Sequence, residues 1–260
     1  MDRMVSPPPA YRDTALELLA SWDRQQTAFI RHRDLRFDTI LTTVERVCGR
    51  TPRILDLACG PGSLGLAARK RFPDAEIIGC DKDPILLRMA HVAFAEDDKT
   101  SLLTVDLDHA EQVLALPGMF DAVISSTALH WLQPGKLSEL YLALADKVRP
   151  GGVFLNGDHF LYDAMAQPSF RQLALDDDKA QQAAEFAKGV DDWETWWSKA
   201  AAAPGFEDAA IARAEVWKDK LAPARKVSLA YHQAALRSAG FSEVGSVWQY
   251  LDDWVVAAIR

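Results

Sequence analysis

The sequence is poor in cysteine and has no long apolar run. Its three cysteines, Cys48, Cys59 and Cys80, are odd in number and lack the spacing of metal ligands. This excludes a disulfide framework, predicts no metal, and favours a reducing compartment, so we expect the protein in the cytoplasm. The N-terminal residues MDRMVSPPPAYRD contain no apolar core of signal-peptide length, and no run approaches the roughly 18 apolar residues of a membrane span. We therefore expect no membrane partner.

Positive charge is also scarce. The 260 residues include 29 Lys and Arg against 37 Asp and Glu, a net charge of -8, and the basic residues are scattered along the chain. A protein that follows nucleic-acid phosphates needs a basic face or stripe. Nucleic acid is therefore not an expected partner. The length suits one large α/β domain with an insertion, or two modest domains.

Short apolar runs alternate with helix-like segments from residue 53 onward. Such runs suit strands covered on both faces, and their alternation with helices predicts right-handed βαβ units and a parallel sheet. The last two runs are close enough to pair antiparallel, so the sheet should end with a reversed strand. The predicted strands are residues 53–57, 76–80, 101–105, 120–125, 152–157, 243–249 and 252–260.

Helices are predicted on both sides of this series. Residues 14–30 and 34–47 precede the first strand, and Asp34 is placed to cap the second of these helices. Residues 160–228 contain no strand-like run and hold four of the eight tryptophans, which predicts a helical insertion. A helix at 229–239, with a turn at Gly240, leads back to the last two strands.

The segment ILDLACGPGSLG carries Gly60, Gly62 and Gly65 in the pattern G-x-G-x-x-G. In NAD-binding proteins a helix N-terminus after such a loop holds a pyrophosphate. Here Asp56 stands near the end of the preceding strand, where its carboxylate would repel a pyrophosphate. The same carboxylate suits a ligand that carries an ammonium group and a sulfonium centre. The loop therefore argues against a dinucleotide.

Two further aspartates follow the next predicted strands. Asp81 closes the second strand, where a carboxylate can accept hydrogen bonds from both hydroxyls of a ribose. Asp106 follows the third, within reach of an adenine amine. Because ligands of open parallel sheets bind beyond the carboxyl ends of the strands, these acids predict a site for an adenosine with a positively charged tail. The alternative role of such residues is turn formation or helix capping, which we expect of Asp83 before Pro84.

Five segments, LDLACGPGSLG, GCDKDP, VDLDH, FDAVISSTALHWL and VRPGGVFL, together resemble the motif series of class I S-adenosylmethionine-dependent methyltransferases of the small-molecule type. The resemblance implies an α/β fold with a Rossmann-like, seven-stranded, mostly parallel sheet whose last strand is antiparallel. It implies a core at residues 51–159 and 229–260. A helical segment at 1–50 would cover the cofactor, and a helical insertion at 160–228, between strands 5 and 6, would form a lid over the acceptor.

The family also implies S-adenosylmethionine as cofactor, with S-adenosylhomocysteine as product. The residues assigned by position are Asp56, Gly60 and Gly62 at the methionine end, Ser125 beneath it, Asp81 at the ribose, Lys82 beside the adenine, and Asp106 and Leu107 at the adenine edge. Arg33 matches a position that clasps the cofactor's carboxylate, although Arg31 and Arg36 lie close by. The alternative to a role beside the adenine is that Lys82 is simply exposed to solvent.

Methyl transfer from a sulfonium needs alignment and exclusion of water, and a base only where the acceptor must lose a proton. Since histidine titrates near neutral pH, His130 and His159, which follow the fourth and fifth strands, are the candidate catalytic residues. The candidate acceptor-binding residues are Trp131, Asp158, Tyr162, Trp193 and Trp197. The alternative is structural, with histidines that only shape the cofactor pocket and a tryptophan stripe that belongs to the core.

The sequence thus predicts an enzyme that methylates a small metabolite or natural product in a cytoplasmic biosynthetic reaction. The alternatives are a protein methyltransferase and a non-catalytic, S-adenosylmethionine-binding domain that regulates or scaffolds a partner. An NAD(P)-dependent oxidoreductase is less favoured. The segment SSTA stands where amino-methylating DNA enzymes carry an Asn/Asp-Pro-Pro-aromatic tetrad, which argues against a DNA acceptor. The sequence does not decide between a monomer and a homo-oligomer.

Overall fold

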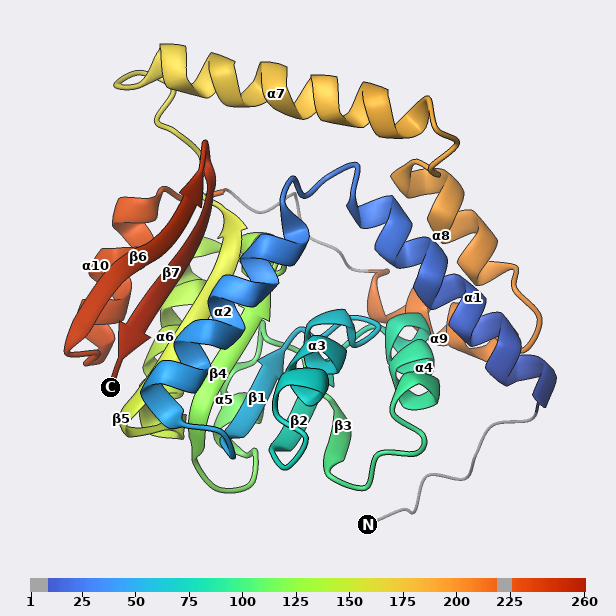
Figure 1. Cartoon of the computed structure of the whole chain (residues 1–260), viewed down its shortest axis with the longest axis horizontal. Coiled ribbons are helices and arrows are strands. Elements are labelled where there is room, and N and C mark those ends of the chain that lie inside the picture. Colours follow the sequence, from blue (N-terminus) through green and yellow to red (C-terminus); the bar gives the residue numbers. More distant parts are fainter. Residues whose placement is uncertain (1–8, 219–225) are drawn as a thin grey trace.

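One sheet with strand order β3-β2-β1-β4-β5-β7-β6 organises the computed structural model, which describes residues 9–218 and 226–260 (Figure 1). Strands β1 to β5 are parallel, and β7 runs antiparallel to both β5 and β6. The seven strands in the described residues are β1 Arg53–Leu57, β2 Glu76–Asp81, β3 Thr100–Thr104, β4 Phe120–Ser126, β5 Val148–His159, β6 Glu243–Tyr250 and β7 Asp253–Ile259. The predicted fold class is confirmed, and the reversed last strand lies one place in from the edge.

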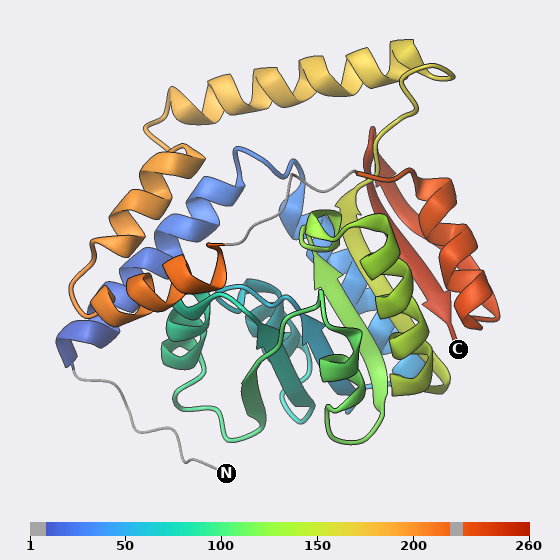
Figure 2. The same ribbon diagram turned by 180° about the vertical axis from the view of Figure 1, so that it is seen from behind.

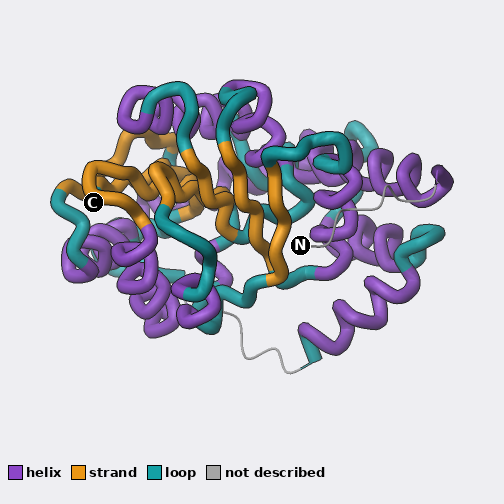
Figure 3. Tube along the Cα trace, turned by 90° about the horizontal axis from the view of Figure 1, so that it is seen from below, coloured by secondary structure: helices purple, strands orange, loops and turns teal. Residues whose placement is uncertain are grey.

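Helices cover both faces of the sheet because the central strands are apolar on both sides. Alternate residues of β1 show this, since Ile54 belongs to one buried cluster and Leu55 to the other. One face packs against α2 Arg33–Cys48 and α3 Ser63–Arg71. The other packs against α5 Ala110–Leu114, α6 Pro134–Lys147 and α10 Leu229–Ala239 (Figure 2). The end-on view shows the strands between two helical layers (Figure 3).

A third apolar cluster lies beside the sheet and joins four helices. These are α1 Pro9–Gln26, α4 Pro84–Ala93, α8 Trp193–Ala201 and α9 Glu207–Val216. Trp196 of α8 is almost fully buried and packs edge-on against Trp22 of α1, with 4.8 Å between ring centroids. This cluster therefore packs the N-terminal helix α1 and the inserted helices α8 and α9 against α4.

Helix α7 Pro168–Phe186 crosses above the end of the sheet where the parallel strands finish (Figure 1). Ala174 is the one buried residue of this helix. Its polar contacts include an ion pair between Asp177 and Arg31, whose Nε lies 2.7 Å from Oδ2 of the aspartate. Helix α7 therefore bridges the β6–β7 hairpin and the N-terminal helices over the carboxyl ends of the strands.

Some element boundaries differ from the prediction. Helix α2 begins at Arg33, and its N-cap residue is His32 in a left-handed conformation with φ 58°, so the capping role expected of Asp34 is wrong. Helix α1 ends at Gln26 rather than at residue 30, and β5 starts at Val148, four residues early, because Gly151 with φ 78° lets the strand continue through the glycine pair. Within the predicted segments, residues 1–8 and 219–225 lie outside the described residues.

None of the helices in the described residues is long and apolar enough to cross a membrane.

Candidate functional site

The site lies at the carboxyl ends of β1, β2, β4 and β5. Its glycine loop adopts conformations that side chains disfavour, with φ 56° at Gly60 and 96° at Gly62. A Cβ at Gly62 would come within 2.7 Å of the Phe94 ring, so the tight approach of α4 requires glycine there. Ala58 after β1 and Thr127 after β4 also have positive φ, 51° and 57°. Backbone strain of this kind is common at functional sites, so it indicates that the ends of β1 and β4 belong to one.

Asp81 is tied to the glycine loop. Its Oδ2 accepts a hydrogen bond from the backbone N–H of Gly60 at 2.8 Å, and its Oδ1 accepts one from Asp83 at 2.9 Å. Each carboxylate oxygen has a second lone pair, so both retain capacity for hydroxyl donors. Burial raises the pKa of Asp81 to about 6. The glycine loop therefore holds the carboxylate of Asp81, the residue predicted to bind the ribose, in a fixed orientation.

Asp56 is buried, and the backbone N–H of Gly65 offsets the cost of that burial only in part. Asp56 is 2% exposed, and its Oδ2 has no hydrogen-bond partner among the described residues. Burial, together with the charge of Asp81, raises the pKa of Asp56 to about 8. The same oxygen lies 3.1 Å from where a Cβ at Gly65 would stand, so it points at the start of α3. A buried carboxyl with one unpartnered oxygen beside a glycine loop fits a ligand that brings positive charge.

The adenine-side candidates are held by side-chain contacts. Lys82 lies 3.1 Å from Asp106 Oδ1 and 3.2 Å from Asp108 Oδ2, with its ammonium 4.6 Å from the centre of the Trp217 ring. Simple solvation of Lys82 is therefore not what the structure shows. Leu107 is buried in the cluster shared with α5 and α6.

Ser125 is fully buried and uses its hydroxyl within the sheet. The hydroxyl donates to the carbonyl oxygen of Leu57 at 2.9 Å and so links the ends of β4 and β1. Because its hydroxyl is used in this contact, Ser125 has a structural place beneath the predicted position of the methionine.

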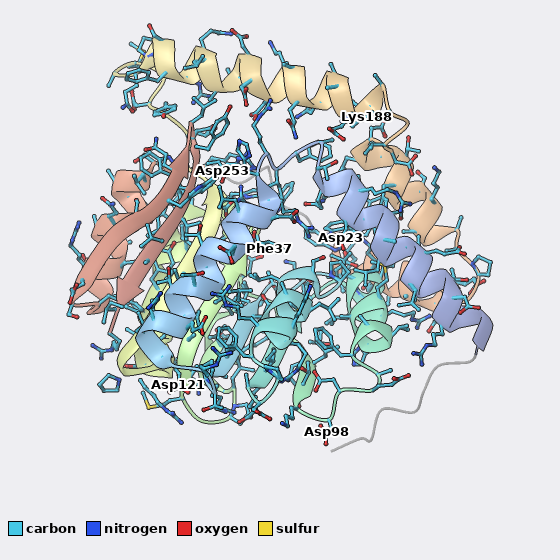
Figure 4. The ribbon with its side chains drawn as sticks, viewed as in Figure 1. Asp23, Phe37, Asp98, Asp121, Lys188 and Asp253 are labelled. Carbon is cyan, nitrogen blue, oxygen red and sulfur yellow. The ribbon has the colours of Figure 1, made fainter. Side chains whose placement is uncertain are left out.

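Three arginines lie close together around the start of α2, and the structure separates the roles of Arg31, Arg33 and Arg36. Arg33 pairs with Asp23 of α1 at 2.9 Å, and Asp23 also accepts from the Ser63 hydroxyl at the start of α3 at 2.7 Å (Figure 4). Arg31 pairs with Asp177 of α7, and Arg36 is buried in an ion pair with Asp253. Arg33 is thus the one that the structure links to the helix after the glycine loop.

His130 and Asp158 form a hydrogen-bonded pair across the ends of β4 and β5. The Nδ1 of His130 lies 2.6 Å from Asp158 Oδ1, and the backbone N–H of His130 donates to Oδ2 at 3.1 Å. Burial opposes ionisation of Asp158, but the contact with His130 holds its pKa below the usual range. When the His130 ring carries a single proton, the contact with the Asp158 carboxylate places that proton on Nδ1 and leaves Nε2 as an acceptor.

His159 lies near this pair, with its ring centroid 6.4 Å from that of His130. Burial and the nearby Arg36 lower the pKa of His159 to about 3, so the imidazole is a weak base at neutral pH. Both histidines line a small cavity together with His232 of α10 and Lys226. Of the two imidazole rings, the described contacts pair only that of His130 with a carboxylate.

The predicted aromatic residues divide between the site and the core. Trp131 is 48% exposed and stacks on Trp193 of α8, with 6.4 Å between ring centroids and 27° between ring planes. Trp197 instead packs under the guanidinium of Arg213, 3.7 Å away, inside the third cluster. Tyr162 donates its hydroxyl to the Leu251 carbonyl at 2.9 Å and so anchors the chain to the β6–β7 hairpin.

Sequence reasoning missed three residues at this site. Asp23 orients Arg33, Arg213 binds Asp83 beside the adenosine side at 2.7 Å, and His232 lines the cavity. A signal existed for His232, which lies one turn before Leu236 on the buried side of its helix. The other two offered none, because their partners are distant in sequence.

Comparison with known proteins finds similarity in the central part of the chain. Residues 54–152 match the family model described as "Methyltransferase domain". Trans-aconitate 2-methyltransferase of Streptomyces avermitilis is 31% identical over 158 residues, which cover 59% of this chain and 56% of that protein. Malonyl-[acyl-carrier protein] O-methyltransferase of Herminiimonas arsenicoxydans is 28% identical over 138 residues, covering 53% and 45%. The chain spans about half the length of the curated relatives it matches.

Solved structures share the fold at lower identity. Human N-acetylserotonin methyltransferase, crystallised in complex with SAM, superposes with a TM-score of 0.57 at 17% identity, covering 96% of this chain and 57% of that chain. Similarity at this level concerns the fold alone.

Proposed function

We propose that this chain, a class I S-adenosylmethionine-dependent methyltransferase by its domain and fold, methylates a small-molecule acceptor. The observation that carries the proposal is the pairing of Asp81, whose carboxylate is held by the glycine loop, with Asp56, whose buried carboxyl has an oxygen without a partner. A pyrophosphate at this loop would disfavour ionisation of Asp56 further, whereas an ammonium group would stabilise its ionised form.

The residues present fit the cofactor along its whole length. Asp81 would accept hydrogen bonds from the ribose hydroxyls, and the Lys82–Asp106 pair would border the adenine. Asp56 would face the ammonium group, and Arg33, oriented by Asp23, would bind the carboxylate. When bound, S-adenosylmethionine supplies a methyl group already activated by the positive charge on its sulfur.

On the acceptor side, His130 would act as general base. Asp158 fixes the imidazole with Nδ1 protonated, so Nε2 is free to take a proton from an acceptor in the cavity. His159 would line the pocket as a neutral ring. The stacked Trp131 and Trp193 do not line this cavity, but Trp131 lies against the His130 ring, with 5.1 Å between ring centroids, and the two tryptophans would offer an acceptor an aromatic surface where α8 of the lid reaches the site. The chemistry then needs only alignment and exclusion of water.

A small acceptor is supported by the helices between β5 and α10. Helix α7 crosses above the carboxyl ends of the strands, and α9 docks on α4, so the insertion covers the site as a lid (Figure 1). The names of the curated relatives, a trans-aconitate 2-methyltransferase and a malonyl-[acyl-carrier protein] O-methyltransferase, are consistent with a biosynthetic or metabolic acceptor. We propose the cytoplasm as the place of action, on the basis of the cysteine content.

Calorimetric titration with S-adenosylhomocysteine tests the proposal, with NADH and NADPH as parallel ligands. We expect micromolar binding of S-adenosylhomocysteine alone. Asp81→Asn should weaken it at least tenfold, or about 1.4 kcal/mol, because a carboxylate acceptor for the ribose is lost. Asp98→Asn, an exposed aspartate outside the site (Figure 4), is the matched control. Binding of a nicotinamide nucleotide instead, or of none of the three, would overturn the proposal.

A further inference from the structure

His232 is a buried histidine that the reaction described above does not use. It lies on α10, 3% exposed, and lines the same cavity as His130 and His159. Its ring packs edge-on against Phe160, which follows β5, with 4.4 Å between ring centroids. The protein therefore brings a third imidazole to the predicted acceptor pocket from an element far along the chain.

Tyr141 fixes the protonation of this ring. The Tyr141 hydroxyl lies 2.5 Å from His232 Nδ1, and both groups are buried. Burial raises the pKa of Tyr141 well above its ordinary value and lowers that of His232 to about 4, so the phenol keeps its proton and the imidazole is neutral. A protonated phenol donates to Nδ1, which then has no hydrogen. The remaining proton of the neutral ring is on Nε2.

The two imidazoles thus offer complementary hydrogen bonds. At His130 the Asp158 carboxylate takes Nδ1–H and leaves Nε2 as an acceptor. At His232 the Tyr141 hydroxyl occupies Nδ1 and leaves Nε2–H as a donor. Neither Nε2 has a hydrogen-bond partner among residues 9–218 and 226–260. The exposed Lys226 adds a positive charge at the wall of the same cavity.

We propose that His232 is a second polar anchor of the acceptor pocket, and that the acceptor is a hydroxyl compound with a neighbouring carbonyl or carboxylate oxygen. The hydroxyl donates to His130 Nε2, and the second oxygen accepts from His232 Nε2–H. Lys226 favours an acceptor whose second oxygen is negatively charged. This assignment rests on the proposed function and names the acceptor class for it.

The reaction at this pair is balanced without a further reagent. The hydroxyl proton passes to His130 Nε2 while an oxygen electron pair forms the bond to the methyl carbon. The carbon–sulfur bond breaks with its electron pair on sulfur, and the proton on His130 then leaves to solvent. His232 keeps its own proton throughout and holds the neighbouring oxygen, so it is a binding group and not an acid or base in the transfer.

Nuclear magnetic resonance of the histidine side chains tests the tautomers in the full chain saturated with S-adenosylhomocysteine. We expect His232 to carry its proton on Nε2 and His130 to carry its proton on Nδ1. Tyr141→Phe, which removes one hydroxyl and keeps the ring, should release His232 into a mixture of tautomers. A His232 ring protonated on Nδ1 in the unmodified protein would overturn the proposal.

Three probe compounds test the acceptor class in the same samples: 2-hydroxybenzoate, benzoate without the hydroxyl, and phenol without the carboxylate. We expect 2-hydroxybenzoate to bind roughly tenfold more tightly than either of the others, because it makes both a charge-assisted hydrogen bond from His232 and a neutral one to His130. His232→Leu should abolish its advantage over phenol and leave phenol unaffected, and His232→Gln, which retains an N–H near the Nε2 position, should restore part of it. His109→Leu, at an exposed histidine, is the matched control.

Equal binding of the three probes, or an unchanged preference in His232→Leu, would overturn the assignment of His232. The calorimetric titration with S-adenosylhomocysteine separates the two proposals. Without binding of that compound the proposed function fails, whereas normal binding with the wrong tautomers or no probe preference rejects the acceptor anchor alone.

Discussion

At the scale of single residues, the unusual feature is a buried carboxyl that stays largely protonated. The pKa of Asp56 is raised to about 8, against an ordinary value of about 4, because burial and the charge of Asp81 disfavour its ionised form. A ligand that brings positive charge to this carboxyl lowers its pKa again. Binding at pH 7 should therefore release a proton.

This linkage makes cofactor affinity depend on pH with a definite sign. Because the free protein holds the Asp56 proton up to about pH 8 and the complex does not, S-adenosylmethionine should bind more tightly as pH rises from 6 to 8, by up to about tenfold per unit. Calorimetry in phosphate and in Tris buffers measures the proton count through the difference in binding enthalpy. Asp56→Asn should remove the pH dependence, while Asp98→Asn keeps it. A binding enthalpy that is equal in both buffers would contradict this assignment.

Individual site residues could be predicted where they follow the end of a predicted strand. Asp56, Asp81 and His130 lie directly after apolar runs, and the parallel sheet brings such positions to one edge. Asp23 and Arg213 were not predictable, since each acts through a partner that only the fold supplies. The sequence also could not rank the two histidines, because the weak basicity of His159 results from its burial in three dimensions.

At the scale of elements, α9 is fastened over the adenosine side of the site. Arg213 donates to Asp83 at 2.7 Å and stacks on Trp197, and Asp83 itself caps α4 through the N–H groups of Ile85 and Leu86. Asp83 follows Asp81 and Lys82, which we propose to lie at the ribose and the adenine, so the contact joins the predicted lid to the segment that would hold the adenosine.

Cutting this contact should loosen the predicted lid. In Arg213→Ala we expect S-adenosylhomocysteine to dissociate about tenfold faster, and amide hydrogens of residues 207–216 to exchange faster. Stopped-flow displacement and hydrogen-exchange mass spectrometry measure the two effects. Lys188→Ala, at an exposed ion pair at the end of α7 (Figure 4), should change neither. An unaltered dissociation rate in Arg213→Ala would show that α9 does not gate the cofactor.

Element boundaries show what periodicity can and cannot predict. Strand β1 and helix α10 match the predicted ranges, because a contiguous apolar run and a helical stripe each end at a clear polar or glycine residue. Strand β5 extends four residues earlier, and α2 has no side-chain cap. Both differences depend on left-handed backbone at Gly151 and His32, which tertiary packing selects and local pattern does not record.

At the scale of the whole molecule, Arg36 joins the N-terminal helices to the last strand. It is fully buried, and its guanidinium pairs with Asp253 of β7 and donates to Thr127 at 2.8 Å and to the Gly157 carbonyl at 3.2 Å (Figure 4). A Cβ at Gly157 would lie 2.7 Å from Arg36 Cδ, so the glycine makes room for this side chain. Burial raises the pKa of Asp253 to about 7 despite the guanidinium.

Removing the arginine should therefore destabilise the fold in a pH-dependent manner. Arg36→Met leaves Asp253 buried without its cation, and we expect a loss of about 3–5 kcal/mol at pH 8. The loss should be smaller at pH 5, because the raised pKa of Asp253 keeps the carboxyl protonated there and the folded state binds the extra proton. Urea unfolding at both pH values measures it.

The control for this change is Arg50→Met, whose side chain is 77% exposed beside Glu45 and should contribute at most about 1 kcal/mol. If Arg36→Met lost the same stability at pH 5 as at pH 8, the cost would come from packing rather than from the stranded charge of Asp253.

The position of β7 between β5 and β6 sets an order of events during synthesis on the ribosome. Strand β6 emerges first but has no neighbour until β7 follows, so neither can join the sheet before residues 253–259 leave the exit tunnel. Until then the nascent chain presents the open edge of β5, a row of unpaired N–H and C=O groups on an apolar strand. The period between completion of β5 and release of β7 is therefore the interval in which this protein is most exposed to aggregation.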